Sequence, residues 1–202
     1  MPILLSEEDV RIVLTMDDLV PAMYDALAQF SSGHVQQPLR NVIEVGDQKA
    51  FFGVMPAFIR TPPVLGTKLV TVFGSNEQVG LPSHLATIIL LDATTGELLA
   101  VMDGRYITEA RTAAVSAASV QLLARDGAGT LAILGTGVQA RSHLEAVASV
   151  TSLEDVRVWS PREERRVAFA WEMQKQGAPS IRAAASAREA VEGADIIVLA
   201  TA

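Results

Sequence analysis

The segment from Thr130 to Ala140, TLAILGTGVQA, constrains the fold more than any other part of this chain. An apolar run leads into Gly135 and Gly137, and with Ala140 the pattern is G-x-G-x-x-A. In a βαβ unit the first glycine permits a tight turn, the second lets a pyrophosphate approach the backbone, and the small third residue lets the helix pack on the strand. The free N–H groups of that helix favour phosphate. The segment therefore predicts a dinucleotide site.

The residues that follow favour this site over a glycine turn that only joins a strand to a helix. Residues 141–150 place apolar side chains at helical spacing, and VRVW at 156–159 predicts a second strand. SPRE at 160–163, with proline at its first helical position, and SARE at 186–189 are typical of capping boxes. Residues 195–202 predict a third strand. This alternation predicts a parallel sheet, and a sheet strand with no helix after it suggests a fragment of a longer domain.

The N-terminal half predicts a mixed or antiparallel sheet preceded by helices. Residues 6–14 and 17–30 are expected to be helical. Gly96 in DATTGE suits the turn of a bulged hairpin. Residues 107–124 predict a long helix with Thr108 as its N-cap. The expected strands are 39–45, 50–56, 66–73, 84–91 and 98–102.

The composition agrees with a folded chain of two domains. Half of the 202 residues are hydrophobic and 19% are charged, which argues against disorder. We predict an α/β fold, with a mixed-sheet domain over residues 1–115. A Rossmann-type domain, incomplete at its C-terminal end, is predicted over residues 116–202.

Charge and residue usage exclude several classes of partner. A net charge of −7 argues against nucleic acid. The chain has no cysteine, so disulfides, thiolate catalysis and sulfur-ligated metals are excluded. Its three histidines are far apart, so no metal site is expected. An early acidic run and the lack of a membrane-spanning apolar run predict a cytoplasmic protein without a membrane partner.

Two basic residues stand among apolar neighbours in the predicted strands. Arg40 shares a strand face with Val42 and Glu44, so it is either a surface residue paired with Glu44 or a functional cation. Lys68 shares a face with Val70. It is either the solvated end of a strand or a partly buried cation, because lysine is seldom fully buried.

Arg111 and His84 each allow two interpretations, one functional and one structural. If Thr108 caps its helix, Arg111 lies in the first turn, where its charge opposes the helix dipole at about 0.3–1 kcal/mol. A guanidinium there would suit a carboxylate or phosphate, unless it forms a salt bridge to Glu109. His84 enters a strand and is either a core histidine or a pocket residue.

The end of the second predicted strand bears on the choice of nicotinamide cofactor. An NAD-selective site has Asp or Glu there, about 20 residues past the glycines, to hold the ribose hydroxyls. This chain has Ser160 and then Arg162, with Arg165 and Arg166 close behind. Ser160 and Arg162 would not repel a 2′-phosphate, and Arg162 could pair with it, so we expect NADP(H) in preference to NAD(H). The alternative is that Ser160 is only a helix cap and that the arginines form a solvated face.

Several stretches together resemble the ornithine cyclodeaminase/mu-crystallin family, and most closely its ketimine reductase branch. TKLVT and the segment that begins at Arg111 are the more specific parts, whereas the glycine turn is generic. The likeness covers essentially the whole chain. It is carried by FSSG (30–33), QPLR (37–40), GVMPAF (53–58), TKLVT (67–71), PSHLAT (82–87), LLAVMDG (98–104), RTAAVSA (111–117), ILGTGVQARSH (133–143) and VRVWS (156–160).

The resemblance implies a homodimer, with a first domain that forms the dimer interface and holds the substrate. The second domain binds NAD(P)(H). By this likeness Arg40, Lys68 and Arg111 are the cations that bind the substrate carboxylate and act in catalysis, with Lys68 catalytic, and His84 is a pocket residue. The implied pyrophosphate turn consists of Gly135, Gly137, Val138 and Gln139. Family members run on for about another hundred residues.

The implied reaction is the NAD(P)H-dependent reduction of a cyclic ketimine carboxylate of the Δ1-pyrroline- or Δ1-piperideine-2-carboxylate type. The resemblance leaves three alternatives open. One is an ornithine cyclodeaminase that yields proline and ammonia. Another is an alanine dehydrogenase-like enzyme, and the third is a non-catalytic binding protein.

Overall fold

The computed structural model describes residues 1–46, 50–177 and 180–201. The chain divides into two compact units. The first consists of Met1–Thr15 and Tyr24–Thr108, and the second of Met16–Met23 and Glu109–Ala202. The domain boundary that the sequence suggests, after residue 115, stays a prediction.

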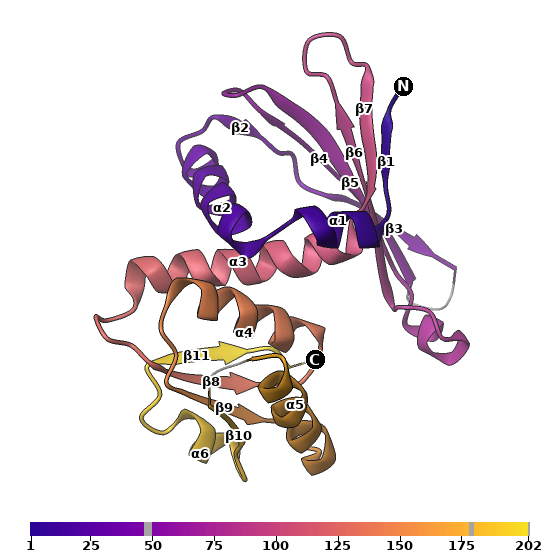
Figure 1. Cartoon of the computed structure of the whole chain (residues 1–202). Helices are drawn as coiled ribbons and strands as arrows, with labels where there is room; N and C mark the ends of the chain where they lie inside the picture. Colours follow the sequence, from indigo (N-terminus) through magenta and orange to yellow (C-terminus); the bar gives the residue numbers. More distant parts are fainter. Residues whose placement is uncertain (47–49, 178–179, 202) are drawn as a thin grey trace. The chain divides into compact units, whose positions relative to one another are not determined.

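The first unit is built on a seven-stranded mixed sheet (Figure 1). Its strands run in the order β1-β7-β6-β5-β4-β2, with β3 also paired to β4. Strand β1 is parallel to β7 and the other pairs are antiparallel, which confirms the predicted mixed sheet. The strands are β1 (Ile3–Leu5), β2 (Val35–Gln36), β3 (Asn41–Val45), β4 (Ala50–Ile59), β5 (Val64–Val72), β6 (His84–Leu91) and β7 (Leu98–Asp103).

The predicted hairpin joins β6 and β7. Asp92 accepts the backbone N–H groups of Thr94 and Thr95 at 2.8 and 2.7 Å. Gly96 takes the left-handed conformation at φ 76°, which a glycine adopts without the steric cost of a Cβ. A register shift between Leu90 and Leu91 supplies the predicted irregularity.

The helices of the N-terminal half begin close to their predicted positions, with one correction. They are α1 (Glu7–Val13), α2 (Met16–Ser31), the 3₁₀ turn η1 (Gly74–Val79) and α3 (Arg105–Leu123). Thr108 is not the N-cap of α3, because the helix begins at Arg105. Asp103 satisfies the first turn instead, since its Oδ1 accepts the Arg105 N–H at 2.9 Å. Arg111 therefore lies in the second turn and not in the first.

The second unit is a four-stranded parallel sheet in the order β10-β9-β8-β11. Strands and helices alternate along the chain, and the order places the first strand of the unit inside the sheet. This is the arrangement of a Rossmann-type nucleotide-binding half and confirms the predicted fold class. The elements are β8 (Thr130–Leu134), α4 (Val138–Val150), β9 (Asp155–Trp159), α5 (Glu163–Lys175), β10 (Ile181–Ala183), α6 (Ala187–Val191) and β11 (Ile196–Leu199).

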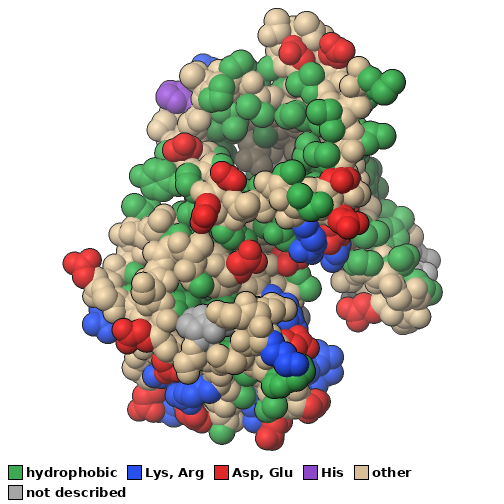
Figure 2. Space-filling model, in the orientation of Figure 1, with side chains coloured by type: hydrophobic (Ala, Val, Ile, Leu, Met, Phe, Trp, Pro, Cys, Tyr) green, Lys and Arg blue, Asp and Glu red, His purple; other side chains and the backbone are tan. Residues whose placement is uncertain are grey.

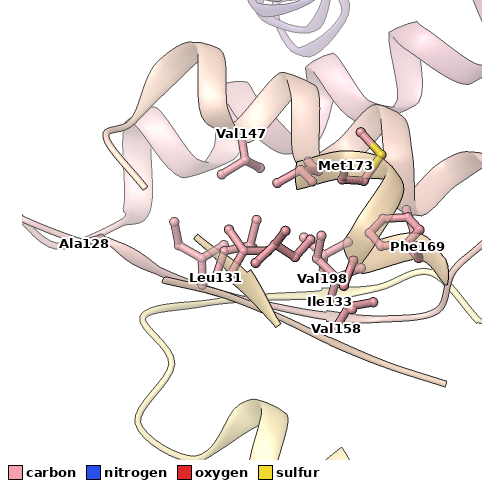
Figure 3. Packing of buried hydrophobic residues seen from close by; sticks show 14 residues of the cluster. Ala128, Leu131, Ile133, Val147, Val158, Phe169, Met173 and Val198 are labelled. Atoms are coloured by element: carbon pink, nitrogen blue, oxygen red, sulfur yellow. The ribbon is translucent and has the colours of Figure 1, made fainter. Parts of the chain in front are cut away.

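A core of buried hydrophobic side chains lies between this sheet and its helices (Figure 3). Leu131 and Ile133 of β8 are fully buried, as is Val158 of β9. Phe169 of α5 and Val147 of α4 pack into the same cluster. A buried side chain of this size contributes about 1.5–3 kcal/mol of transfer free energy. The rigid sheet fixes the turn that leaves β8.

Asp195 ties the start of β8 to the start of β11. Its Oδ2 accepts the N–H groups of Gly129 and Thr130, each at 3.0 Å. Its Oδ1 accepts from the guanidinium of Arg125. The N–H of Thr130, the Arg125 side chain and the N–H of Gly129 lower the Asp195 pKa from 3.8 to about 2.

We predict that Asp195→Asn lowers the melting temperature by several degrees at neutral pH. A folded-state pKa below the unfolded value gives stability that is present above the unfolded pKa and is lost as the pH falls through the folded one. The difference between wild type and variant should therefore shrink between about pH 4 and about pH 2. Thermal melts across that range test it, with Asp126→Asn as the control. An unchanged difference at all pH values would refute the assignment.

Candidate functional site

The turn after β8 requires glycine at position 135. Gly135 has φ 129°, a conformation that side chains rarely adopt. A Cβ built there would lie 2.6 Å from the carbonyl carbon of Ala200 and closer still to its oxygen. The Gly135 N–H donates to the Trp159 carbonyl at the end of β9, at 2.8 Å. Three chain segments therefore meet at this turn.

Gly137 directly precedes helix α4, and no side-chain cap accepts the N–H groups of the first turn of this helix. Gly137 is the N-cap, at φ −84°. A Cβ on Gly137 would meet no atom within 4 Å. Uncapped N–H groups and the positive end of the helix dipole suit a phosphate, and the open space beside Gly137 suits its approach. The residues present fit the pyrophosphate of a dinucleotide.

The neighbours of Gly137 support the same arrangement. Ala140 is fully buried, as expected for the small residue at which the helix packs on the sheet. Val138 is exposed at the start of the helix. The Oε1 of Gln139 is buried and has no hydrogen-bond partner within the described part of the chain. This oxygen is an acceptor at the first turn of α4 that none of the described residues satisfies.

The end of β9 lies at the same edge of the sheet, and here the structure corrects one prediction. Ser160 does not cap α5 and Pro161 is not its first residue, because α5 begins at Glu163 with Arg162 as N-cap. Ser160 is buried, and its hydroxyl donates to the Arg162 carbonyl at 3.0 Å. Arg166 donates to the Ser160 carbonyl at 3.2 Å. Arg162 is exposed, and its guanidinium makes no interaction with the residues that the structure describes.

Lys68 lies on β5 in the first unit. It pairs with Met55 of β4 and with Ile88 of β6, and directly opposite residues share one face of the sheet. Its Nζ donates to Thr108 Oγ1, in the first turn of α3, at 3.5 Å. Lys68 is half-buried. It is therefore a partly buried cation and not a fully solvated strand end.

The other predicted substrate-site residues, Arg40, Arg111 and His84, are placed differently. Arg40 is exposed, directly before β3, and its side chain makes no ion pair with Glu44. His84 pairs with Val72, on the same face as Lys68 but four residues along the strand, about 13 Å away. Arg111 is half-buried and forms no ion pair among the described residues, so the alternative salt bridge to Glu109 is not made. Glu109 instead accepts the hydroxyl of Ser142 at 2.5 Å.

The described residues offer neither a metal site nor a membrane span. Among residues 1–46, 50–177 and 180–201, no three His, Cys, Asp or Glu side chains gather in a way that could hold a metal ion. Over the same ranges, no helix combines the length and the apolar character needed to cross a bilayer.

Comparison with known proteins now places the chain. A sequence model described as the ornithine cyclodeaminase/mu-crystallin family matches residues 1–202. The chain belongs to this family. Mouse ketimine reductase mu-crystallin is 43% identical over 99% of the chain and 64% of its own length. The family resemblance seen in the sequence is confirmed.

Solved structures of family relatives share the fold. Δ1-pyrroline-2-carboxylate reductase of Thermococcus litoralis, in complex with NADH and L-proline, aligns with a TM-score of 0.90 and 36% identity. The match covers 98% of this chain and 61% of that one. An archaeal alanine dehydrogenase dimer with bound NAD aligns with a TM-score of 0.91 and 30% identity, over 99% and 60% of the two chains. The chain thus spans less than two thirds of the length of these relatives.

Proposed function

We propose that this chain carries the dinucleotide turn and the cationic residues of an NAD(P)H-dependent imine reductase that reduces cyclic ketimine carboxylates. The observation that carries the proposal is the uncapped start of α4 at Gly137, held at the sheet edge by the Gly135 turn. Similarity to mouse ketimine reductase and to the Thermococcus Δ1-pyrroline-2-carboxylate reductase supports the choice of reaction.

Each proposed residue has a distinct task. Gly137, Val138 and Gln139 would hold the pyrophosphate through the first turn of α4. The bound nicotinamide supplies the hydride that reduces the C=N bond. Arg111, with Arg40, binds the substrate carboxylate through charge-assisted hydrogen bonds.

We assign to Lys68 the delivery of the proton, or the stabilisation of charge, at the imine nitrogen. Its ammonium group offsets the charge that develops at the imine nitrogen or donates a proton there. His84, about 13 Å from Lys68 along the sheet, would line the pocket and not share this step.

Turnover with a substrate panel tests the reaction. NADPH and NADH are each offered with Δ1-pyrroline-2-carboxylate and Δ1-piperideine-2-carboxylate, and NADP⁺ and NAD⁺ are each offered with L-ornithine and L-alanine. The oxidation or reduction of the cofactor and the formation of product are followed in each mixture. We expect stoichiometric oxidation of reduced cofactor with the cyclic imines. Proline formed from ornithine without net cofactor use would replace the proposal with a cyclodeaminase.

Amino-acid dehydrogenation is a second candidate, favoured by the TM-score of 0.91 with the archaeal alanine dehydrogenase. It uses the same cofactor turn and the same carboxylate-binding cations, with hydride moving in the opposite direction. Reduction of NAD⁺ or NADP⁺ by L-alanine in the same panel distinguishes it.

We keep NADP(H) as the preferred cofactor, although the two aligned structures named above hold NADH and NAD. The support is chemical, because the residue directly after β9 is Ser160 and not an acid, and the exposed guanidinium of Arg162 makes no interaction with the described residues. We predict that NADPH binds roughly tenfold more tightly than NADH, and that Arg162→Ala removes most of the difference. Calorimetric titration measures both, with Arg188→Ala as a surface control. Tighter binding of NADH by the wild type would overturn the preference.

A homodimer formed through the first unit is also part of the proposal. Leu4, Ile43 and Leu85 are exposed at 73%, 59% and 38%. By strand register they share the sheet face opposite to Lys68. Figure 2 shows exposed hydrophobic side chains over the part of the molecule that Figure 1 assigns to this sheet. An apolar face of this kind suits a second copy. The absence of cysteine agrees with a cytoplasmic location.

A further inference from the structure

We propose that Thr108 is a positioning residue whose hydroxyl oxygen holds the ammonium group of Lys68. The inference rests on the proposed function, which assigns the transferred proton to Lys68. Lys68 Nζ donates to Thr108 Oγ1 at 3.5 Å, and the two residues are 40 positions apart in sequence. The contact is therefore made by the fold and not by local chain geometry.

The strand neighbours of Lys68 explain why an acceptor from a helix matters. Met55 and Ile88 pair with Lys68 on the two flanking strands, and their side chains stand on the same face of the sheet. Neither offers a hydrogen-bond acceptor of any strength to an ammonium group. The Thr108 hydroxyl supplies an uncharged oxygen that accepts a hydrogen bond from this amine.

The first turn of α3 is held firmly against β6. The Gly104 N–H donates to the Ala86 carbonyl at 2.8 Å. A Cβ at Gly104 would lie 3.0 Å from that of Ala86, so any larger residue would have to push the two segments apart by a few tenths of an ångström. Asp103 caps the next N–H, that of Arg105, and the Thr108 N–H donates to Gly104 at 2.9 Å. The backbone thus fixes the position from which the Thr108 side chain extends.

An ion pair fixes the same helix start to α1. The guanidinium of Arg105 donates to both carboxylate oxygens of Glu7, at 2.7 and 2.5 Å, and Arg11 donates to Glu7 at 2.9 Å. Burial opposes ionisation of Glu7, but hydrogen bonds and charges from Arg105 and Arg11 outweigh it and lower the pKa of this carboxyl. Thr108 therefore lies in a helical turn that contacts β6 through a backbone hydrogen bond and α1 through the ion pair.

Two substitutions separate the hydroxyl from the shape of the side chain. Thr108→Val keeps the branched volume and removes the oxygen, whereas Thr108→Ser keeps the oxygen. In the imine reductase assay we expect Thr108→Val to lower kcat about tenfold with the cofactor KM unchanged. Thr108→Ser should stay within about threefold of the wild type. Equal kcat in wild type and Thr108→Val would overturn the proposal.

A double-mutant comparison tests whether Thr108 acts through Lys68. In a Lys68→Met background, Thr108→Val should have little further effect on residual turnover, because the group that it positions is gone. A purely structural role would produce the same fold loss in both backgrounds and would contradict the proposal.

A labelling experiment tests the contact without any turnover. The chain has only three lysines, so acetic anhydride labelling followed by peptide mass mapping resolves each of them. Lys175, which lies 3.6 Å from the Trp171 ring centre, serves as the internal reference. We expect Thr108→Val, but not Thr108→Ser, to change the Lys68 rate relative to Lys175 by severalfold. An unchanged ratio overturns the positioning role. A changed ratio in a chain without imine reductase activity supports the contact and overturns the proposed function instead.

Discussion

Replacing Gly135 with alanine is expected to disrupt the second unit and abolish dinucleotide binding together. The residue has φ 129°, and an added Cβ would overlap the backbone of Ala200, which cannot move without breaking the pairing of β11 with β8. Strain and overlap together should lower the free energy of unfolding by at least about 3 kcal/mol. Chemical denaturation followed by circular dichroism measures this loss.

Gly137→Ala is the matched comparison two residues away. Gly137 has φ −84° and open space where a Cβ would lie, so the unfolding free energy should change by less than about 1 kcal/mol. Dinucleotide affinity should nevertheless fall at least about tenfold, because the methyl group occupies the approach path of the pyrophosphate. If both variants were less stable but bound NADPH with unchanged affinity, or if Gly137→Ala alone bound NADPH normally, the proposal would be contradicted. The glycine turn would then have a role in folding but none in dinucleotide binding.

Arg111→Ala is expected to produce the second large effect, confined to the substrate. Loss of a charge-assisted hydrogen bond to a carboxylate costs about 1.5–3 kcal/mol, which corresponds to a roughly 10- to 150-fold rise in the KM of the imino acid. The affinity for NADPH should stay within about twofold, because the guanidinium is assigned to the substrate and not to the cofactor. Steady-state kinetics and a separate cofactor titration measure the two effects.

Arg111→Lys is the control for this prediction. It keeps the charge but loses the planar fork that binds a carboxylate through two hydrogen bonds, so an intermediate KM is expected. An equal loss of substrate and cofactor affinity in Arg111→Ala would contradict the assignment. It would indicate that the residue supports the fold of α3.

The longer elements of the fold could be predicted from the sequence, whereas its shortest strands could not. β6 has the predicted bounds, and the alternation of β8, α4 and β9 follows directly from residue spacing. β1 and β10 each have three residues. β1 pairs with β7, which is far away in the sequence, and β10 pairs with β9, from which helix α5 separates it. Short segments carry too few residues for a periodic pattern to appear.

Helix starts show how side-chain hydrogen bonds override a local rule. Thr108 has the right chemistry for an N-cap, yet α3 begins three residues earlier, where the side chain of Asp103 accepts the first N–H of the helix directly after β7. Ser160 likewise has the chemistry of a cap, but its hydroxyl bonds to the Arg162 carbonyl within the turn. In both cases more than one residue near the start of the helix could act as the cap. The path of the chain in the folded protein determines which of them does.

The candidate site could be predicted in part. The role of the glycine turn follows from three residues in a fixed local pattern, and its geometry agrees with that pattern. The environment of Lys68 depends on strand register and on Thr108, 40 residues along the chain, so no local pattern indicates it. The distance between Lys68 and His84 along the sheet likewise appears only once the register of β5 and β6 is known.

Titration of the ¹⁵N-labelled chain with NADPH, followed through its backbone amide signals, tests the central claim most directly. We predict that the largest shifts occur at Gly137, Val138 and Gln139, with further shifts at Arg162 and smaller ones for NADH at that position. Saturable binding with these amides unmoved, or shifts centred in another part of the chain, would contradict the claim that the start of α4 holds the dinucleotide.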